Sequence, residues 1–179
     1  MADKVKYGVR KVHYALATQN GFAAPVAMPG AVSLTLTPNG DTNTFFADDT
    51  RFYVTVANNG YDAELEVAYV PESFLTDVLG MTLNATDKVI VEKTGVQPKP
   101  FALLFEEEGD DTGTKFVLYN CIATRPNRSL STTTDTIDPQ TQTISISALP
   151  MADNKVLAFT GAETPSTVLD GWYTTVWGD

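Results

Sequence analysis

Short segments in which apolar and polar residues alternate, separated by turn signals, constrain this chain more than any other feature. The clearest is Tyr61–Tyr69, in which every second side chain is apolar. Three of the residues between them are acidic: Asp62, Glu64 and Glu66. Successive side chains point to opposite faces of a strand, so this segment has one apolar and one acidic face.

The residues on either side predict a hairpin followed by a helix. Phe52, Val54 and Val56 share one face of Arg51–Ala57. Asn58-Asn59-Gly60 can supply the positive φ angles of a tight turn, so we expect Arg51–Ala57 to pair with Tyr61–Tyr69.

A short helix is expected directly after this hairpin. Pro71 can begin it because its missing N–H costs little there, and Gly80 can end it in the left-handed conformation. The apolar stripe consists of Phe74, Leu75, Val78 and Leu79. We expect the apolar side chains of both strands and of this helix to form the core.

Other segments also have strand character. Phe101–Glu106 and Thr114–Ala123 predict a second hairpin, with Glu107–Gly113 as its turn. Further strands are expected at Ala31–Thr37, Thr44–Ala47, Lys88–Glu92, Thr143–Ser147 and Val156–Thr160. Helical periodicity over long stretches is absent, so we predict an all-β fold, a β-sandwich or β-barrel with one short α-helix.

The chain is expected to form a single domain over residues 1–179, since it contains no internal repeat and no shift in composition. Residues 4–16 fit either a strand or an arm ordered by a neighbour. Thr18–Gly30 is rich in Gly, Ala and Pro, so the predicted N-terminal arm extends to about residue 30. The Thr-rich segment at about 124–142 is predicted to be an extended loop, either crossing the outside of the domain or ordered by a partner.

The charge is strongly negative, with 22 Asp and Glu against 12 Lys and Arg and a net charge of −10. Binding to DNA or RNA depends on neutralising phosphates with Lys and Arg, so a nucleic-acid-binding surface is not expected. The N-terminus lacks the apolar region of a signal peptide, and no run of 18 apolar residues occurs. We therefore expect folding in a reducing cytosol and no membrane insertion.

The residue inventory gives no support for catalysis, a cofactor or a metal. His13 is the only histidine and Cys121 the only cysteine, which is expected to be a buried, inert thiol. No phosphate-binding, dinucleotide-binding, zinc-protease or nucleophile-elbow motif occurs. The acidic run Glu106–Asp111 is expected to be a solvated turn, the alternatives being a lumen or interface feature and a loose cation site.

Trp172, Tyr173 and Trp177 lie close to the end of the chain. Large aromatic side chains at a terminus indicate that it is buried, either on its own domain or on a neighbour. The same three residues also fit a different class of protein, a β-sandwich binding or decoration module with an aromatic patch.

Three stretches resemble a known family in their order. They are VKYGVRKVHYALAT, then PGAVSLTLTPNGDTNTFFADDTRFYVTVANNGYDAELEVAYVPESFLTDVLG, then PFALLFEEEGDDTGTKFVLYNCIATRP followed by TISISALP. This series is similar to the major tail proteins of phages with long, non-contractile tails, the phi13-type group. The resemblance covers nearly the whole chain and rests on the ordered series rather than on one diagnostic motif.

The resemblance implies a tail-tube fold and hexameric rings that stack into a hollow tube, through which DNA passes into the host without specific binding. It implies a virion protein made in the host cytoplasm, with terminator, distal-tail and tape-measure proteins as partners. Asp62, Glu64 and Glu66 are then candidates for the lumen wall, where charge within a Debye length of about 8–10 Å would repel DNA. An outward, solvated acidic face remains the alternative.

Overall fold

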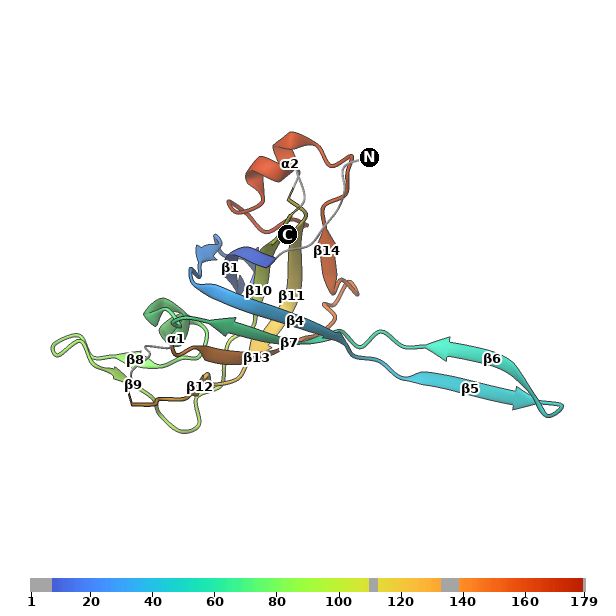
Figure 1. Cartoon of the computed structure of the whole chain (residues 1–179), viewed down its shortest axis with the longest axis horizontal. Helices are drawn as coiled ribbons and strands as arrows, with labels where there is room; N and C mark the ends of the chain where they lie inside the picture. Colours follow the sequence, from blue (N-terminus) through green and yellow to red (C-terminus); the bar gives the residue numbers. More distant parts are fainter. Residues whose placement is uncertain (1–7, 110–112, 133–138, 179) are drawn as a thin grey trace.

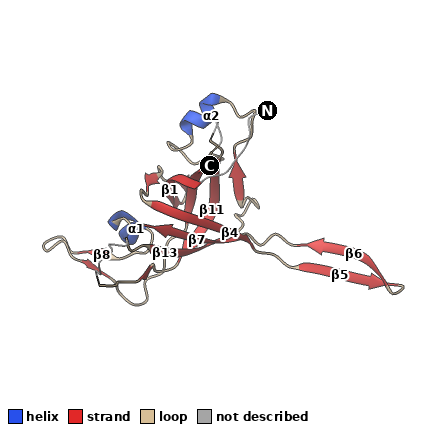
Figure 2. Cartoon of the chain, viewed as in Figure 1, coloured by secondary structure: helices blue, strands red, loops and turns tan. Residues whose placement is uncertain are grey.

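A folded antiparallel β-sheet dominates the computed structural model, which describes residues 8–109, 113–132 and 139–178 (Figures 1 and 2). Its strands follow the order β2 (Gly21–Phe22), β1 (Gly8–Thr18), β10 (Phe101–Glu108), β11 (Lys115–Ala123), β13 (Gln142–Ala148), β7 (Tyr61–Val67) and β4 (Ala31–Pro38). Three short strands pair beside this path: β3 (Val26–Ala27), β12 (Asn127–Arg128) and β14 (Leu157–Phe159). The predicted all-β class is confirmed.

The main core lies between two halves of this sheet, because β4, β7 and β13 run across β1, β10 and β11 (Figure 1). The helix α1 (Glu72–Asp77) adds Phe74, which is fully buried. Its ring packs edge-on against Tyr14 and Phe101, with centroids 5.2 and 5.6 Å away. Burying one such side chain stabilises the fold by about 1.5–3 kcal/mol.

The predicted helix is confirmed in its place and in its apolar stripe. Pro71 caps α1, and Gly80 follows it with φ +70°, in the left-handed region that favours glycine. All four predicted stripe residues are buried: Phe74, Leu75, Val78 and Leu79.

A second core cluster covers the other face of β1, β10 and β11. It contains Trp172 and Val176 from the C-terminal segment, which also forms the unpredicted helix α2 (Ser166–Gly171). The end of the chain therefore docks on its own domain. Because β10 is covered on both faces, Phe101–Phe105 is buried at every position, which accounts for its unbroken apolar run.

The predicted pairing of Arg51–Ala57 with Tyr61–Tyr69 is wrong. β6 (Thr50–Val56) instead pairs with β5 (Thr42–Ala47), while β7 pairs with β4 and β13. The chain reverses at Asp48 and Asp49, whose φ angles of 50° and 59° meet the requirement of a two-residue hairpin turn.

The segment 58–60 instead continues the chain from β6 into β7. Asn39 N–H donates to the Gly60 carbonyl at 2.9 Å, and Asn59 N–H donates to the Asn39 carbonyl at 2.8 Å. Residues 38–41 and the turn signal at 58–60 therefore face each other across one long hairpin. They interrupt its ladder rather than reverse the chain.

For residues 4–16 the sequence left open a strand or an arm. From Gly8 onwards the structure shows a strand, β1, which is part of the main sheet. β2 and β3 pair with β1 within the expected loop 18–30. Residues 1–7 of the arm, and residues 133–138 of the Thr-rich loop, lie outside the described residues. A small separate pair, β8 (Thr82–Leu83) and β9 (Ile90–Val91), lies beside α1.

Candidate assembly surfaces

The three predicted acidic residues lie side by side along β7, on the face turned away from the core. Asp62 and Glu64 are exposed and Glu66 is partly buried, whereas the intervening Ala63 and Leu65 are buried. The neighbouring strands add small hydroxyl side chains to the same face: Ser33, Thr35 and Thr37 from β4, and Thr143, Ser145 and Ser147 from β13.

Hydrogen bonds hold two of these three carboxylates in place. Ser147 and Asn39 donate to Asp62 at 3.0 and 3.2 Å. Glu66 accepts hydrogen bonds from Thr141 and Ser33, which lower the pKa of its carboxyl. This arrangement gives β7 an ordered anionic surface that can repel polyanions.

The most prominent feature of the molecule is the β5–β6 hairpin, which projects far from the main sheet (Figure 1). Its strands bond only to each other among the described residues. Gly60 marks the point of departure, with φ +105° and the Ala148 carbonyl oxygen 1.9 Å from where a Cβ would stand. Only glycine fits there, so the bend is encoded locally.

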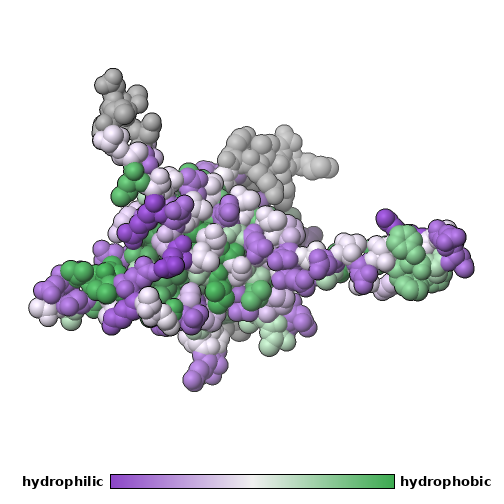
Figure 3. All heavy atoms as spheres, turned by 90° about the horizontal axis from the view of Figure 1, so that it is seen from below, coloured by the Kyte–Doolittle hydropathy of each residue, from purple (hydrophilic) through white to green (hydrophobic). Residues whose placement is uncertain are grey.

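Large apolar side chains on this hairpin are exposed instead of forming the predicted core. Phe52 is 74 % exposed and Val56 is 72 % exposed, and Val54 is exposed as well, so these three were assigned wrongly. Phe45, Phe46 and Tyr53 are also more than half exposed. Figure 3 shows apolar residues gathered near the far end of the projection. A two-stranded hairpin with bare aromatic side chains is marginal in water, and an exposed apolar patch of this kind is typical of an interaction surface.

Sequence reasoning missed this surface, although a signal was present. Two adjacent aromatic pairs, Phe45-Phe46 and Phe52-Tyr53, make both faces of the hairpin apolar. A strand with two apolar faces needs cover on both sides. Residues 8–109, 113–132 and 139–178 offer cover on neither side of this hairpin.

The predicted solvated acidic turn begins with a buried residue, Glu106, which is 1 % exposed. Arg10 Nε donates to its carboxylate at 2.8 Å, Lys11 Nζ at 3.2 Å, and Lys115 Nζ lies 3.5 Å away. The Tyr173 hydroxyl donates to it at 3.3 Å. The solvated-turn interpretation is therefore wrong for Glu106, which joins β1, β11 and the C-terminal segment.

The cations around Glu106 determine its ionisation. Burial opposes the charged form, but the hydrogen bonds from Arg10 and Lys11 and the charge of Lys115 outweigh it and lower the pKa. Burial and the Glu106 charge raise the pKa of Tyr173, which keeps its hydroxyl protonated and donating. This cluster is structural in character, since each charge has a partner.

The aromatic residues at the chain end do not form an exposed patch. Trp172 is 3 % exposed, and its indole donates to the Phe116 carbonyl at 3.4 Å. Tyr173 stacks on His13 with ring centroids 4.5 Å apart, whereas Trp177 is about half exposed. These residues mainly attach the C-terminal segment to the sheet.

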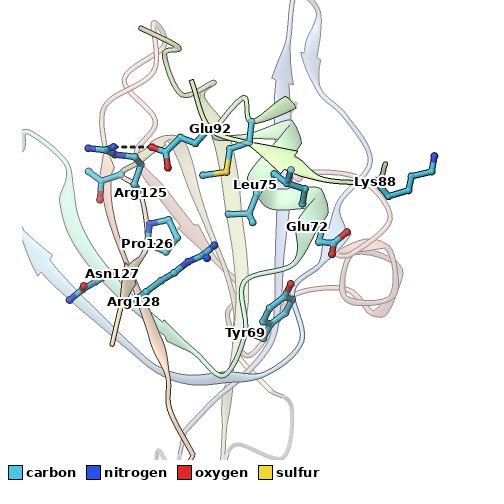
Figure 4. Close-up of a pocket in the computed structure, with 12 residues that line it drawn as sticks. Tyr69, Glu72, Leu75, Lys88, Glu92, Arg125, Pro126, Asn127 and Arg128 are labelled. Carbon is cyan, nitrogen blue, oxygen red and sulfur yellow. Dashed lines mark hydrogen bonds and ion pairs between the residues drawn. The ribbon is translucent and has the colours of Figure 1, made fainter. Parts of the chain in front are cut away.

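A cleft of about 910 Å³ lies between α1, the β8–β9 pair and the segment entering β12 (Figure 4). Leu75, Met81 and Ile90 supply its apolar lining. Its charged lining residues are Glu72, Lys88, Glu92, Arg125 and Arg128. Arg125 is paired with Glu92 at 2.8 Å, while Lys88 and Arg128 form no ion pair within the described residues.

The chemistry of the remaining candidate groups is limited. Cys121 is fully buried, and burial raises the pKa of its thiol to about 12, so it is a poor nucleophile. Within the described ranges, no three His, Cys, Asp or Glu side chains are grouped so as to hold a metal ion. None of the helices in that part of the chain is long and apolar enough to cross a membrane.

Comparison with solved structures identifies the class of fold. The chain is similar to the anti-feeding prophage tube-terminating cap, at 13 % identity, covering 88 % of this chain and 94 % of that chain with a TM-score of 0.54. It is also similar to the sheath/tube terminator of the extracellular contractile injection system PVC, at 13 % identity, 89 % and 100 % coverage and a TM-score of 0.55.

A chain of the PVC sheath–tube complex matches at 11 % identity, 90 % and 95 % coverage and a TM-score of 0.53. No family model and no curated protein sequence matches the chain. At these identities the likeness establishes the fold alone. The chain therefore has a phage tail-tube-like fold, the architecture of tube and tube-terminating subunits, as predicted.

Proposed function

We propose that this protein is a structural tail subunit that assembles with copies of itself into the tube of a phage tail. The observation that carries the proposal is the projecting β5–β6 hairpin, whose aromatic side chains are not covered by any described residue of their own chain. A tail-tube-like fold that presents such a surface is suited to binding its neighbours.

We further propose that six copies form a ring and that these rings stack into the hollow tube of a long, non-contractile tail. Terminator, distal-tail and tape-measure proteins would contact this tube, and the virion tail would be its location after synthesis in the host cytoplasm. In this proposal the contacts are heterologous: the hairpin of one copy meets a different surface of the next copy. Heterologous contacts close into rings or continue as filaments, and a tube requires both.

The acidic face of β7 would line the lumen. Asp62, Glu64 and Glu66 are aligned along one strand and flanked by small hydroxyl residues, which makes a smooth anionic wall. Such a wall repels the phosphates of passing DNA and offers no base-reading side chains. Catalysis has no place in this function.

Light scattering on the purified protein over a range of concentrations tests the proposal. The mass should rise far above that of one chain, and Phe46→Ser with Phe52→Ser should lower it again because the exposed aromatic surface is lost. Leu149→Ser removes an exposed apolar side chain outside the hairpin and should leave assembly unchanged. A single-chain mass at every concentration would contradict the proposal.

Tube termination is a second candidate, favoured by the similarity to two terminators. A terminator would stop at one ring and block the growth of tubes made by another subunit. The alternative function as a decoration module rested on an exposed aromatic patch near the end of the chain. That support is removed, because Trp172 is buried.

A further inference from the structure

We propose that the tip of the β5–β6 hairpin of one copy seats in the cleft beside α1 of a second copy. This inference rests on the proposed function, which requires contacts between copies, and it names both surfaces of one such contact. The hairpin tip is defined here as residues 45–53, and the cleft is the one shown in Figure 4.

The two surfaces lie at opposite ends of the molecule. Figure 1 shows the β5–β6 hairpin at one end of the long axis, with α1, β8, β9 and β12 towards the other. A chain therefore cannot place its own tip in its own cleft. Contact between the tip of one copy and the cleft of the next is heterologous and leaves a free tip and a free cleft at the two ends, so it can propagate.

The apolar parts of the two surfaces match in kind. The tip offers three phenylalanine side chains, each more than 60 % exposed: Phe45, Phe46 and Phe52. The cleft offers Leu75, Met81 and Ile90 as a lining, with Pro126 at one side. A cleft of this size accepts several side chains, and aromatic anchors in such a hollow are typical of the centre of a protein interface.

The net charges of the two surfaces are opposite: the tip has two carboxylates and Arg51, and the cleft has three cations and two carboxylates. Asp48 and Asp49 form the turn at the tip and are exposed. Lys88 and Arg128 lie on the cleft and have no ion-pair partner in the described part of the chain. Docking would give both cations a partner, and complementary charge favours the correct pairing over others.

Another hollow illustrates this selectivity. It lies between β1 and β4, has an apolar lining of Val9, Val32, Leu34, Leu36 and Phe105, and contains Glu107 but no Lys or Arg. Its apolar lining suits aromatic side chains, but it offers no Lys or Arg to pair with Asp48 and Asp49. The cleft beside α1 is therefore the better match for the tip.

A charge exchange tests the pairing. Reversing the tip (Asp48→Lys with Asp49→Lys) or the cleft (Lys88→Asp with Arg128→Asp) should raise the concentration needed for assembly at least about tenfold, since like charges then face each other. A chain with all four substitutions should recover most of the loss. Glu163→Lys with Asp170→Lys is the control for the reversed tip, because it makes the same change in net charge at exposed residues elsewhere. This variant should assemble like the unmodified protein.

Disulfide formation between copies tests the geometry. Chains with Phe46→Cys and chains with Ile90→Cys, mixed and oxidised, should form a mixed dimer, while native Cys121 is buried and does not interfere. Phe46→Cys mixed with Val32→Cys probes the hollow beside β4 and should give no mixed dimer.

The outcomes separate the docking inference from the proposed function. If the unmodified protein assembles but the reversed tip assembles equally well, and Phe46→Cys fails to join Ile90→Cys, the docking inference is overturned and the tube function stands. A mixed dimer with Val32→Cys instead would also overturn it. If the unmodified protein never assembles, both are overturned.

Discussion

At Glu106 a single carboxylate joins three parts of the chain that are far apart in sequence. The sequence around it, an acidic run leading to glycine, predicted a turn in water. The structure extends β10 to Glu108 and brings cations from β1 and β11 against the Glu106 side chain. Arg10 and Lys11 lie 96 and 95 residues before it, so no local pattern could indicate them, whereas Lys115 is its cross-strand neighbour in the predicted hairpin.

Replacing Glu106 should destabilise the fold. Glu106→Gln leaves Lys115, which is only 11 % exposed, without its carboxylate, and we expect a loss of about 1–3 kcal/mol in the free energy of unfolding. Urea denaturation measures this loss. Glu108→Gln is the matched control, because Glu108 is exposed, and should change stability by less than about 0.5 kcal/mol. Equal effects would contradict a structural role for Glu106.

The same cluster predicts acid sensitivity. The folded-state pKa of Glu106 is lowered, so its contribution is complete above the ordinary value of 4.5 and is lost as the pH falls through the folded pKa. The melting temperature of the unmodified protein should therefore fall more steeply than that of Glu106→Gln below about pH 4.5. Other carboxylates affect both proteins alike. If the melting temperatures of the two proteins fell in parallel with pH, Glu106 would not be the source of the acid sensitivity.

Among the elements, those with a clean alternation or a complete helix signal were predictable. β7, the β10–β11 hairpin, β13 and α1 fall where the pattern indicates, because each buries one face or both against the same core. The turn signal at 58–60 led to a wrong pairing, because turn chemistry does not specify which strands pair. α2 was missed because its six residues include no buried side chain.

The acidic face of β7 was partly predictable for the same reason. Alternation places Asp62, Glu64 and Glu66 on one face, and the structure keeps them together. The hairpin tip was missed because the pairing of β5 with β6 across Asp48 and Asp49 was not recognised, although the two strands are adjacent in the chain. The cleft was not predictable, since it depends on the meeting of α1, β9 and β12. Those are contacts between segments far apart in the chain.

The departure point of the hairpin is tested at Gly60. An alanine Cβ there would lie 1.9 Å from the Ala148 carbonyl oxygen and also require φ near +105°. We expect Gly60→Ala to cost about 2–4 kcal/mol by urea denaturation. Gly95→Ala is matched in its positive φ but has no atom nearby, so it should cost about 1–2 kcal/mol. Equal losses of stability in the two variants would show that the close approach of the Ala148 carbonyl to Gly60 does not exclude a larger residue.

Removing the hairpin should separate folding from assembly. Deleting residues 41–57 joins Gly40 to Asn58, close to where Asn39 and Gly60 already share a hydrogen bond. The apolar side chains removed contribute nothing to either core cluster, so the melting temperature should change by only a few degrees. Size-exclusion chromatography should show a single chain. Assembly as complete as that of the full chain would remove the hairpin from the interface.

At the scale of the whole molecule, the acidic face should govern how an assembled tube treats DNA. If this face lines the lumen as proposed, replacing Asp62, Glu64 and Glu66 with Lys gives a wall that binds DNA, so assembled tubes should retain DNA on sedimentation, less so in high salt. Replacing the same three residues with Gln removes their negative charge without adding positive charge. Tubes of this control variant should retain little DNA. No retention by Lys-substituted tubes would place this face outside the lumen.

A long apolar projection, a cleft at the other end and an acidic strand face form one arrangement that suits a self-assembling conduit. Electron microscopy of the concentrated, purified protein tests this most directly. The account predicts six-fold rings or hollow tubes whose walls are built by this chain alone. Particles that are single chains at every concentration, even when seeded with a tail-initiating complex, would contradict it.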